Sequence, residues 1–93
     1  MAEVLNETQV KEKATQVPDW TVEGKELKQE MKFKDFIAAM DFVNKLVEPA
    51  EAAGHHPDIA ISYNQVTITL TTHDAGGLTE KDFEMAKQIS SLQ

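Results

Sequence analysis

The sequence predicts an α+β domain, a four-stranded antiparallel sheet with three helices packed on one face, in the order α-β-β-α-β-β-α. Two segments, 20–33 and 59–71, alternate apolar and polar residues, as strands with one buried face do. Three others, 6–17, 35–53 and 79–92, carry apolar residues at helical spacing behind capping residues. Because two hairpins with one apolar face each need cover, we expect helices on that face and one domain over residues 1–93.

The first helix and first hairpin are indicated by cap and turn residues. Asn6 can cap a helix with Gln9 as its reciprocal partner, and Pro18 stops that helix. Trp20 begins an alternating run as a core residue, and Gly24 marks the turn. The apolar positions of the returning strand are Leu27, Met31 and Phe33.

A long helical pattern follows, with Asp35 as its cap. Pro49 interrupts the pattern; because proline lacks a donor and clashes one turn back, we expect a kink or a restart. Gly54 is a natural left-handed stop, so His55 and His56 lie just past a helix end. The predicted apolar stripe comprises Phe36, Ile37, Met40, Val43, Leu46 and Val47.

The second hairpin and the last helix complete the chain. We expect a turn at Asn64-Gln65 between two alternating runs, and a loop at 76–77. Thr79 and Asp82 match a capping box with Asp in place of the usual Glu or Gln. An exposed edge of such a sheet is a natural place for a second subunit to pair. The last helix presents Phe83, Met85, Ala86, Ile89 and Leu92 on its apolar side.

Composition excludes several classes of protein. Nine basic and sixteen acidic residues give a net charge of −7, which argues against direct binding to nucleic acid or to an anionic membrane. The absence of cysteine excludes disulfides and thiolate metal sites. The start, MAEVLNETQV, does not have the pattern of a secretory signal, and no apolar stretch approaches the roughly 20 residues that span a bilayer. We therefore expect a cytoplasmic protein.

The chain's three histidines are the main candidates for chemistry. The ordinary pKa of a histidine side chain, about 6.5, lets it act as general acid or base near neutral pH. The hairpin leaves from position 58 and returns near position 71, so His73 should lie close to His55 and His56. Glu51 would share a face with His55 if the helix ran on, and could then hold its tautomer.

Other interpretations of these residues stay open at this stage. Histidines beside a helix end are commonly part of a solvated polar loop. Two histidines and a carboxylate can bind a metal, but adjacent residues rarely aim both rings at one ion and the HExxH spacing is absent. Covalent catalysis is disfavoured because there is no cysteine and no serine in a recognisable nucleophile elbow.

A set of residues at fixed spacing resembles the signature of the pterin-4a-carbinolamine dehydratases, also known as dimerisation cofactors of a homeodomain transcription factor. The likeness is close in the C-terminal half; in the N-terminal half it rests on element order, Trp20 and the helix start over 33–42. Pro49 and Gly54 depart from the pattern. The residues that carry it are Glu51, His55, His56, Pro57, Tyr63, His73 and Asp82.

The resemblance implies loss of water from a 4a-hydroxytetrahydropterin to give the quinonoid dihydropterin, in recycling of the pterin cofactor of aromatic amino acid hydroxylases. By the same resemblance, His55 carries the main proton transfer and His73 a second one. His56 binds substrate and assists, with Pro57 shaping the wall. The implied orienting and tuning residues are Glu51 and Asp82, with Lys81 a weaker candidate.

The resemblance also implies that the reaction needs no metal, and we expect no cofactor. The implied partners are the pterin substrate and further copies of the chain, as a homodimer or homotetramer. An alternative function is a protein-interaction module that stabilises dimers of another protein, such as a transcription regulator.

Overall fold

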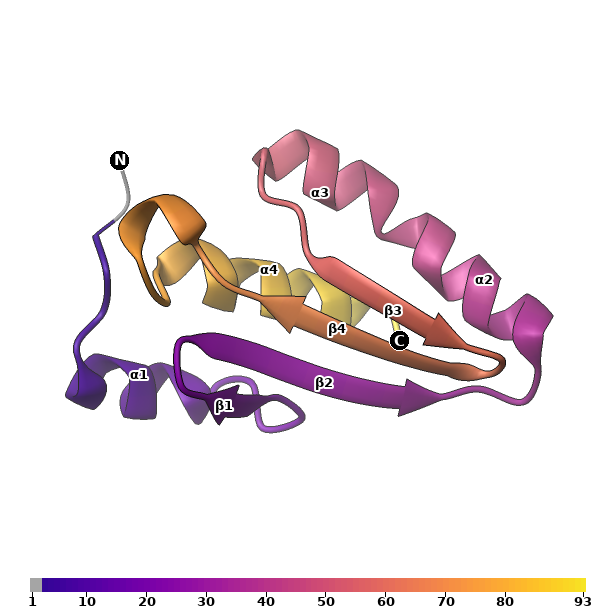
Figure 1. The fold of residues 1–93 in the computed structure, drawn as a ribbon, viewed down its shortest axis with the longest axis horizontal. Coiled ribbons are helices and arrows are strands. Elements are labelled where there is room, and N and C mark those ends of the chain that lie inside the picture. The colour runs from indigo at the N-terminus through magenta and orange to yellow at the C-terminus, as the bar shows by residue number, and fades with distance from the viewer. Residues whose placement is uncertain (1–2) are drawn as a thin grey trace.

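A four-stranded antiparallel sheet in the order β1-β2-β4-β3 lies at the centre of the structure, a computed structural model that describes residues 3–93. Met1 and Ala2, the start of the amino-terminal segment considered above, lie outside the described residues. The strands are β1 (Thr21–Glu23), β2 (Glu26–Lys32), β3 (Asp58–Ser62) and β4 (Gln65–Leu70). The helices are α1 (Glu7–Ala14), α2 (Phe36–Lys45), α3 (Val47–Ala53), the short 3-10 helix η1 (His73–Ala75) and α4 (Glu80–Ser91) (Figure 1).

The predicted fold class and element order are confirmed, with the long helix divided into α2 and α3. The break falls at Leu46, which caps both helices. Pro49 is the third residue of α3, where its missing N–H costs no helical hydrogen bond. Its ring would clash with the carbonyl four residues earlier, at Lys45, which is the last residue of α2. The predicted restart therefore has a direct steric cause.

Both predicted capping boxes are present. At α1, the Asn6 side chain accepts from the Gln9 backbone N–H at 2.8 Å, and the Gln9 side chain accepts from the Asn6 backbone N–H at 2.9 Å. At α4, Thr79 and Asp82 form the same reciprocal pair. These short-range bonds satisfy N–H groups that a helix start leaves without partners.

The core lies between the sheet and the helices. Val66, Ile68 and Leu70 of β4 and Leu27 of β2 are fully buried in one cluster with the inner side of α4. Trp20 is buried as expected, and its Nε1–H donates to Ser90 Oγ at 3.1 Å. This packing sets the position of α4 across the sheet, and with it the position of the first turn of that helix.

The predicted stripe is confirmed at Leu46, which is buried, and at Val43, which packs against the core, but it is wrong at Phe36, Ile37 and Val47, which are exposed. The sheet-facing side is formed by Ala39, Phe42 and Leu46, whereas Phe36 and Ile37 are 50% and 70% exposed. Phe42 contributes to this rotation of the helix, because its ring packs against that of Phe33 in a tilted arrangement with 5.3 Å between centroids. A second, outward apolar side, here called the α2 surface, is thus formed by Phe36 and Ile37 of α2 and by Val47, the first residue of α3.

The second hairpin turns one residue earlier than predicted, at Tyr63-Asn64, and Ser62 pairs with Gln65. The Asn64 amide donates to the Phe33 carbonyl at 2.8 Å, and the Phe33 N–H donates to the Asn64 carbonyl at 2.8 Å. These bonds to the end of β2 fix Asn64 inside the turn. Because the register shifts by two residues, Asp58 faces Thr69 while the paired side chains of β3 and β4 keep their predicted faces; Tyr63, expected within the strand, lies in the turn instead.

Candidate active site

The ends of three elements meet beside β4. Gly54 closes α3 in a left-handed conformation, with φ of 62°, and the next two residues are His55 and His56. His73 is the first residue of η1, with two residues between it and the end of β4, and Lys81 lies in the first turn of α4. Together they form one open pocket of about 240 Å³. Its lining comprises Gly54, His55, His56, Thr71, Thr72, His73, Asp74 and Lys81. The hairpin therefore brings all three histidines to one pocket, as the sequence predicted.

His55 is held in place by the buried carboxylate of Asp82. Its Nε2 lies 2.6 Å from Asp82 Oδ1; the His55 side chain is 11% exposed and that of Asp82 is 0% exposed. The second oxygen, Oδ2, accepts from Thr72 Oγ1 at 2.8 Å and from the Thr79 backbone N–H at 2.9 Å. Asp82 is thus both the cap residue of α4 and the support of an imidazole in the pocket, and its position is fixed by all of these bonds.

His56 has a different and exposed partner. Its Nε2 lies 2.5 Å from Glu51 Oε2, and the two side chains are 61% and 69% exposed. The condition for pairing Glu51 with His55, a helix that runs on to His55, is not met, because α3 ends at Ala53 and the left-handed turn at Gly54 carries His55 toward α4. An exposed pair of this kind restrains its histidine only weakly, so His56 is free to adjust.

Two of the candidate residues lie away from the histidine pocket. Pro57 lines a neighbouring apolar pocket of about 250 Å³, which it shares with Glu51 and His56. Tyr63 lies in the turn at the far end of β3, with φ of 53° and 65% exposure. His56 stands between the polar and the apolar pocket. The remaining lining of the apolar pocket is Val43, Leu46, Val47, Ala50 and Ile59.

Sequence reasoning missed Thr72 altogether. This residue is buried and contacts both Asp82 and Thr79 through its hydroxyl. Only its position next to His73 in the sequence could have suggested a role for Thr72 in the site. The contact with Asp82 forms because the chain turns back through a bridge between Thr72 and Gly77, and the local sequence pattern does not reveal this. Within residues 3–93, no three His, Asp or Glu side chains converge as the ligands of a metal ion would.

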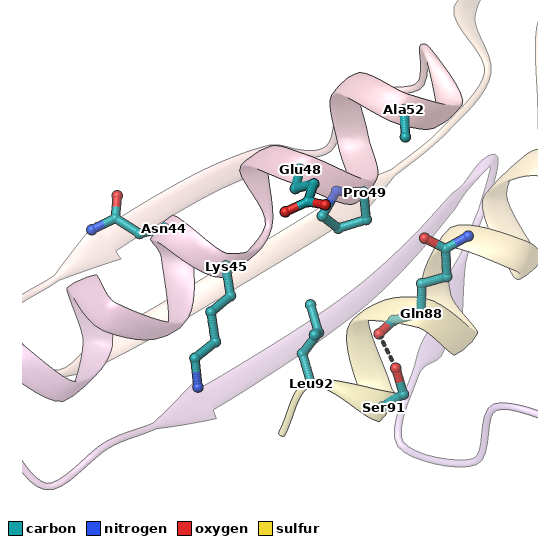
Figure 2. A pocket seen from close by; sticks show the side chains of 8 residues that line it. All are labelled: Asn44, Lys45, Glu48, Pro49, Ala52, Gln88, Ser91 and Leu92. Atoms are coloured by element: carbon teal, nitrogen blue, oxygen red, sulfur yellow. Dashed lines mark hydrogen bonds between the residues drawn. The ribbon is translucent and has the colours of Figure 1, made fainter.

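A separate groove of about 520 Å³ lies between α2–α3 and α4. Figure 2 shows that its titratable side chains, Lys45 and Glu48, come from the α2–α3 side, with Gln88 and Ser91 opposite them on α4. No histidine lines it. The groove therefore lacks the imidazole groups that line the smaller pocket. Its other lining residues are Asn44, Pro49, Ala52 and Leu92.

None of the helices in the described part of the chain is both long enough and apolar enough to span a membrane.

Comparison with known proteins assigns the chain to a family. Residues 3–92 match the family model described as pterin 4 alpha carbinolamine dehydratase. The chain belongs to this family. A relative from Cyanothece sp. PCC 7425 named "Putative pterin-4-alpha-carbinolamine dehydratase" is 68% identical over 92 residues, which cover 99% of this chain and 95% of the relative. A relative of the same name from Nostoc sp. PCC 7120 is 60% identical, with 99% of both chains covered.

Solved structures of the dehydratase fold agree. The transcriptional coactivator/pterin dehydratase from Brucella melitensis superposes with a TM-score of 0.92 at 32% identity, covering 97% of this chain and 98% of that one. A pterin dehydratase-like protein described as a RuBisCO assembly factor in the alpha-carboxysome superposes with a TM-score of 0.63 at 23% identity. This superposition covers 78% of this chain and 84% of the assembly factor, and it shows a likeness of fold alone.

Proposed function

We propose that this member of the dehydratase family removes water from 4a-hydroxytetrahydropterin to give quinonoid dihydropterin, by histidine acid and base catalysis, in recycling of the tetrahydropterin cofactor. The observation that carries the proposal is the convergence of His55, His56 and His73 on one pocket, with His55 held by the buried Asp82. Family membership supplies the substrate class.

The reaction needs two proton movements. The bond between C4a and the hydroxyl oxygen breaks as that oxygen takes a proton and leaves as water. The adjacent ring nitrogen loses its proton, and its electrons form the new double bond to C4a. No electrons are gained or lost overall, so a base and an acid on the protein suffice.

His55 suits the part of the base. When it takes the proton from the ring nitrogen, the resulting imidazolium lies 2.6 Å from a carboxylate and is stabilised by it. His73 is exposed in η1, across the pocket from α3, and suits protonation of the leaving hydroxyl. His56, held only by an exposed carboxylate, can follow the substrate and hydrogen bond to it. Lys81 adds a positive charge at the rim.

A direct rate assay tests the proposal. Purified protein without added metal is mixed with 4a-hydroxytetrahydropterin, and dehydration is followed by absorbance. We expect a rate well above the spontaneous one, and we expect His55→Ala and His73→Ala each to lose much of it while circular dichroism shows the fold intact. A rate equal to the spontaneous one would refute the dehydratase assignment, and full activity in both variants would refute the site.

We also propose that the chain forms a homodimer or homotetramer. The α2 surface exposes Phe36, Ile37 and Val47 to solvent, and β3 is an edge strand whose Ile59 and Ile61 are each 38% exposed. Ile59 faces Ile68 and Ile61 faces Val66, so both isoleucines lie on the apolar face of the sheet yet remain incompletely covered. A second copy that covers these side chains would extend a small core.

A second function, that of a protein-interaction module, has one specific observation in its favour: the similar protein from Brucella melitensis is described as a transcriptional coactivator as well as a pterin dehydratase. The same α2 surface would then receive a transcription regulator. A stable heteromeric complex that persists when all three histidines are replaced by alanine would support this function, and loss of the complex on that replacement would argue against it.

A further inference from the structure

The hydroxyl groups of Thr72 and Thr79 form a buried hydrogen-bonded chain that reaches Asp82, the partner of His55. Thr72 Oγ1 is 2.8 Å from Thr79 Oγ1 and 2.8 Å from Asp82 Oδ2, and Thr79 Oγ1 also accepts from the Lys81 backbone N–H at 3.3 Å. Thr72 is 9% exposed, and Thr79 and Asp82 are not exposed at all. Among residues 3–93 every buried side-chain nitrogen and oxygen has a hydrogen-bond partner, so this network is complete.

The backbone of Thr72 is fixed as firmly as its side chain. Its N–H donates to the Gly77 carbonyl at 3.3 Å, and its own carbonyl accepts from the Ala75 and Gly76 N–H groups at 3.1 Å. The loop thus holds the Thr72 hydroxyl against the carboxylate.

The direction of each hydrogen bond follows from the number of protons available. Thr72 has one hydroxyl proton and donates it to Asp82 Oδ2. The proton between the two hydroxyls therefore comes from Thr79. Oδ2 accepts twice and carries no proton, which leaves Oδ1 to face His55 Nε2. Because an imidazole nitrogen is ordinarily more basic than a carboxylate, the proton between Oδ1 and Nε2 belongs to the imidazole.

We propose that Thr72 is a positioning residue of the reaction, which orients Asp82 so that His55 is protonated at Nε2 and reacts with the substrate through Nδ1. With Nε2–H committed to Asp82, the neutral ring offers the lone pair of Nδ1 to a proton on the pterin ring nitrogen. The role of Nδ1 in the reaction rests on the proposed dehydratase function. The tautomer of His55 does not rest on it, because it is a property of the unliganded protein.

Three variants test the role of Thr72. Thr72→Val keeps the shape of the side chain and removes its hydroxyl, whereas Thr72→Ser keeps the hydroxyl. Thr69→Val is the matched control on β4, where Thr69 is half-buried and faces away from the core. We expect Thr72→Val to lower kcat by about tenfold with KM changed less than twofold, since one hydrogen bond to a charged group is lost. Thr72→Ser should recover most of kcat, and Thr69→Val should leave it unchanged.

Nitrogen-15 NMR of the histidine rings supplies a readout that a purely structural role would not move. In the unaltered protein, His55 should show a protonated Nε2 and an unprotonated Nδ1, and Thr72→Val should raise the fraction of the other tautomer. Thr72→Ser should resemble the unaltered protein.

A His55 protonated at Nδ1 in the unaltered neutral protein would overturn the inference. So would a Thr72→Val protein with unchanged tautomer and unchanged kcat. If the unaltered protein shows the expected tautomer and no dehydratase activity, the proposed function fails while the assignment of the tautomer stands. If Thr72→Val does not fold, the tautomer in the unaltered protein and the kcat of Thr72→Ser decide the matter.

Discussion

Replacing Asp82 by Asn separates the charge of this residue from its shape. Oδ2 of Asp82 accepts from Thr72 Oγ1 and from the Thr79 N–H, so the amide oxygen of Asn would take that place. The amide nitrogen would then face His55 Nε2 at the 2.6 Å contact and donate to it. His55 would have to carry its proton on Nδ1, and the lone pair that we assign to the base would be lost.

The size of the effect can be worked out from these contacts. A positioned general base contributes about 10²–10⁴ in rate, and the corresponding change in serine proteases costs about 10⁴ through the wrong tautomer. We expect Asp82→Asn to lower kcat by about 10²–10³, which corresponds to about 3–4 kcal/mol of transition-state stabilisation. Stability should fall by only about 1–3 kcal/mol, since each hydrogen bond keeps a partner while the charge is lost.

The assay combines stopped-flow absorbance of 4a-hydroxytetrahydropterin with urea denaturation of the same samples. Asp19→Asn is the matched control, because Asp19 is exposed in the turn before β1 and away from the pocket. A total stability of about 5–15 kcal/mol leaves the Asp82→Asn protein folded under assay conditions. An Asp82→Asn protein that retains kcat within twofold would refute the reasoning, as would an equal loss in the control.

Three further predictions follow from the exposure and backbone geometry around the site. Glu51→Gln should lower kcat less than tenfold in the same absorbance assay, because Glu51 and His56 are 69% and 61% exposed; a loss as large as that of Asp82→Asn would contradict this ranking. Gly54→Ala should lower the urea-derived free energy of unfolding by about 1–2 kcal/mol, because φ is 62° there while a new Cβ would meet no atom within 4 Å; unchanged stability would show that the chain relaxes at this turn. Ile37→Glu should reduce the assembly mass in size-exclusion chromatography with light scattering and leave circular dichroism unchanged, because Ile37 is 70% exposed; an unaltered mass would place the interface elsewhere.

The exposed side of α2 shows where sequence pattern was ambiguous. The helix carries apolar residues on more than one side, and periodicity selected Phe36 and Ile37 where the structure buries Ala39 and Phe42. The choice depends in part on Phe33, which lies at the end of β2 and packs against Phe42. A contact between two elements contributed to the rotation, and the pattern within one element could not reveal it.

The turn of the second hairpin shows the same limit in a milder form. Alternation correctly predicted the two strands and the faces of their paired side chains. The location of the turn was decided by the bonds between Asn64 and Phe33, which join residues 31 positions apart. An error of one residue in the turn shifted the register by two, and the histidines still met because the hairpin returns to the same end of the sheet.

The sequence by itself determined the fold class, the helix caps, a kink or restart near Pro49, the left-handed stop at Gly54 and the meeting of three histidines. These features follow from local chemistry: cap side chains, the steric clash of a proline ring with the preceding turn and the alternation of strands. Tertiary structure alone decided that Asp82 supports His55 and that Thr72 completes the network, whereas the pairing of Glu51 with His56 is a local contact across the turn at Gly54. His55 and Asp82 are 27 residues apart, and only the packing of α4 across the sheet sets the 2.6 Å between them.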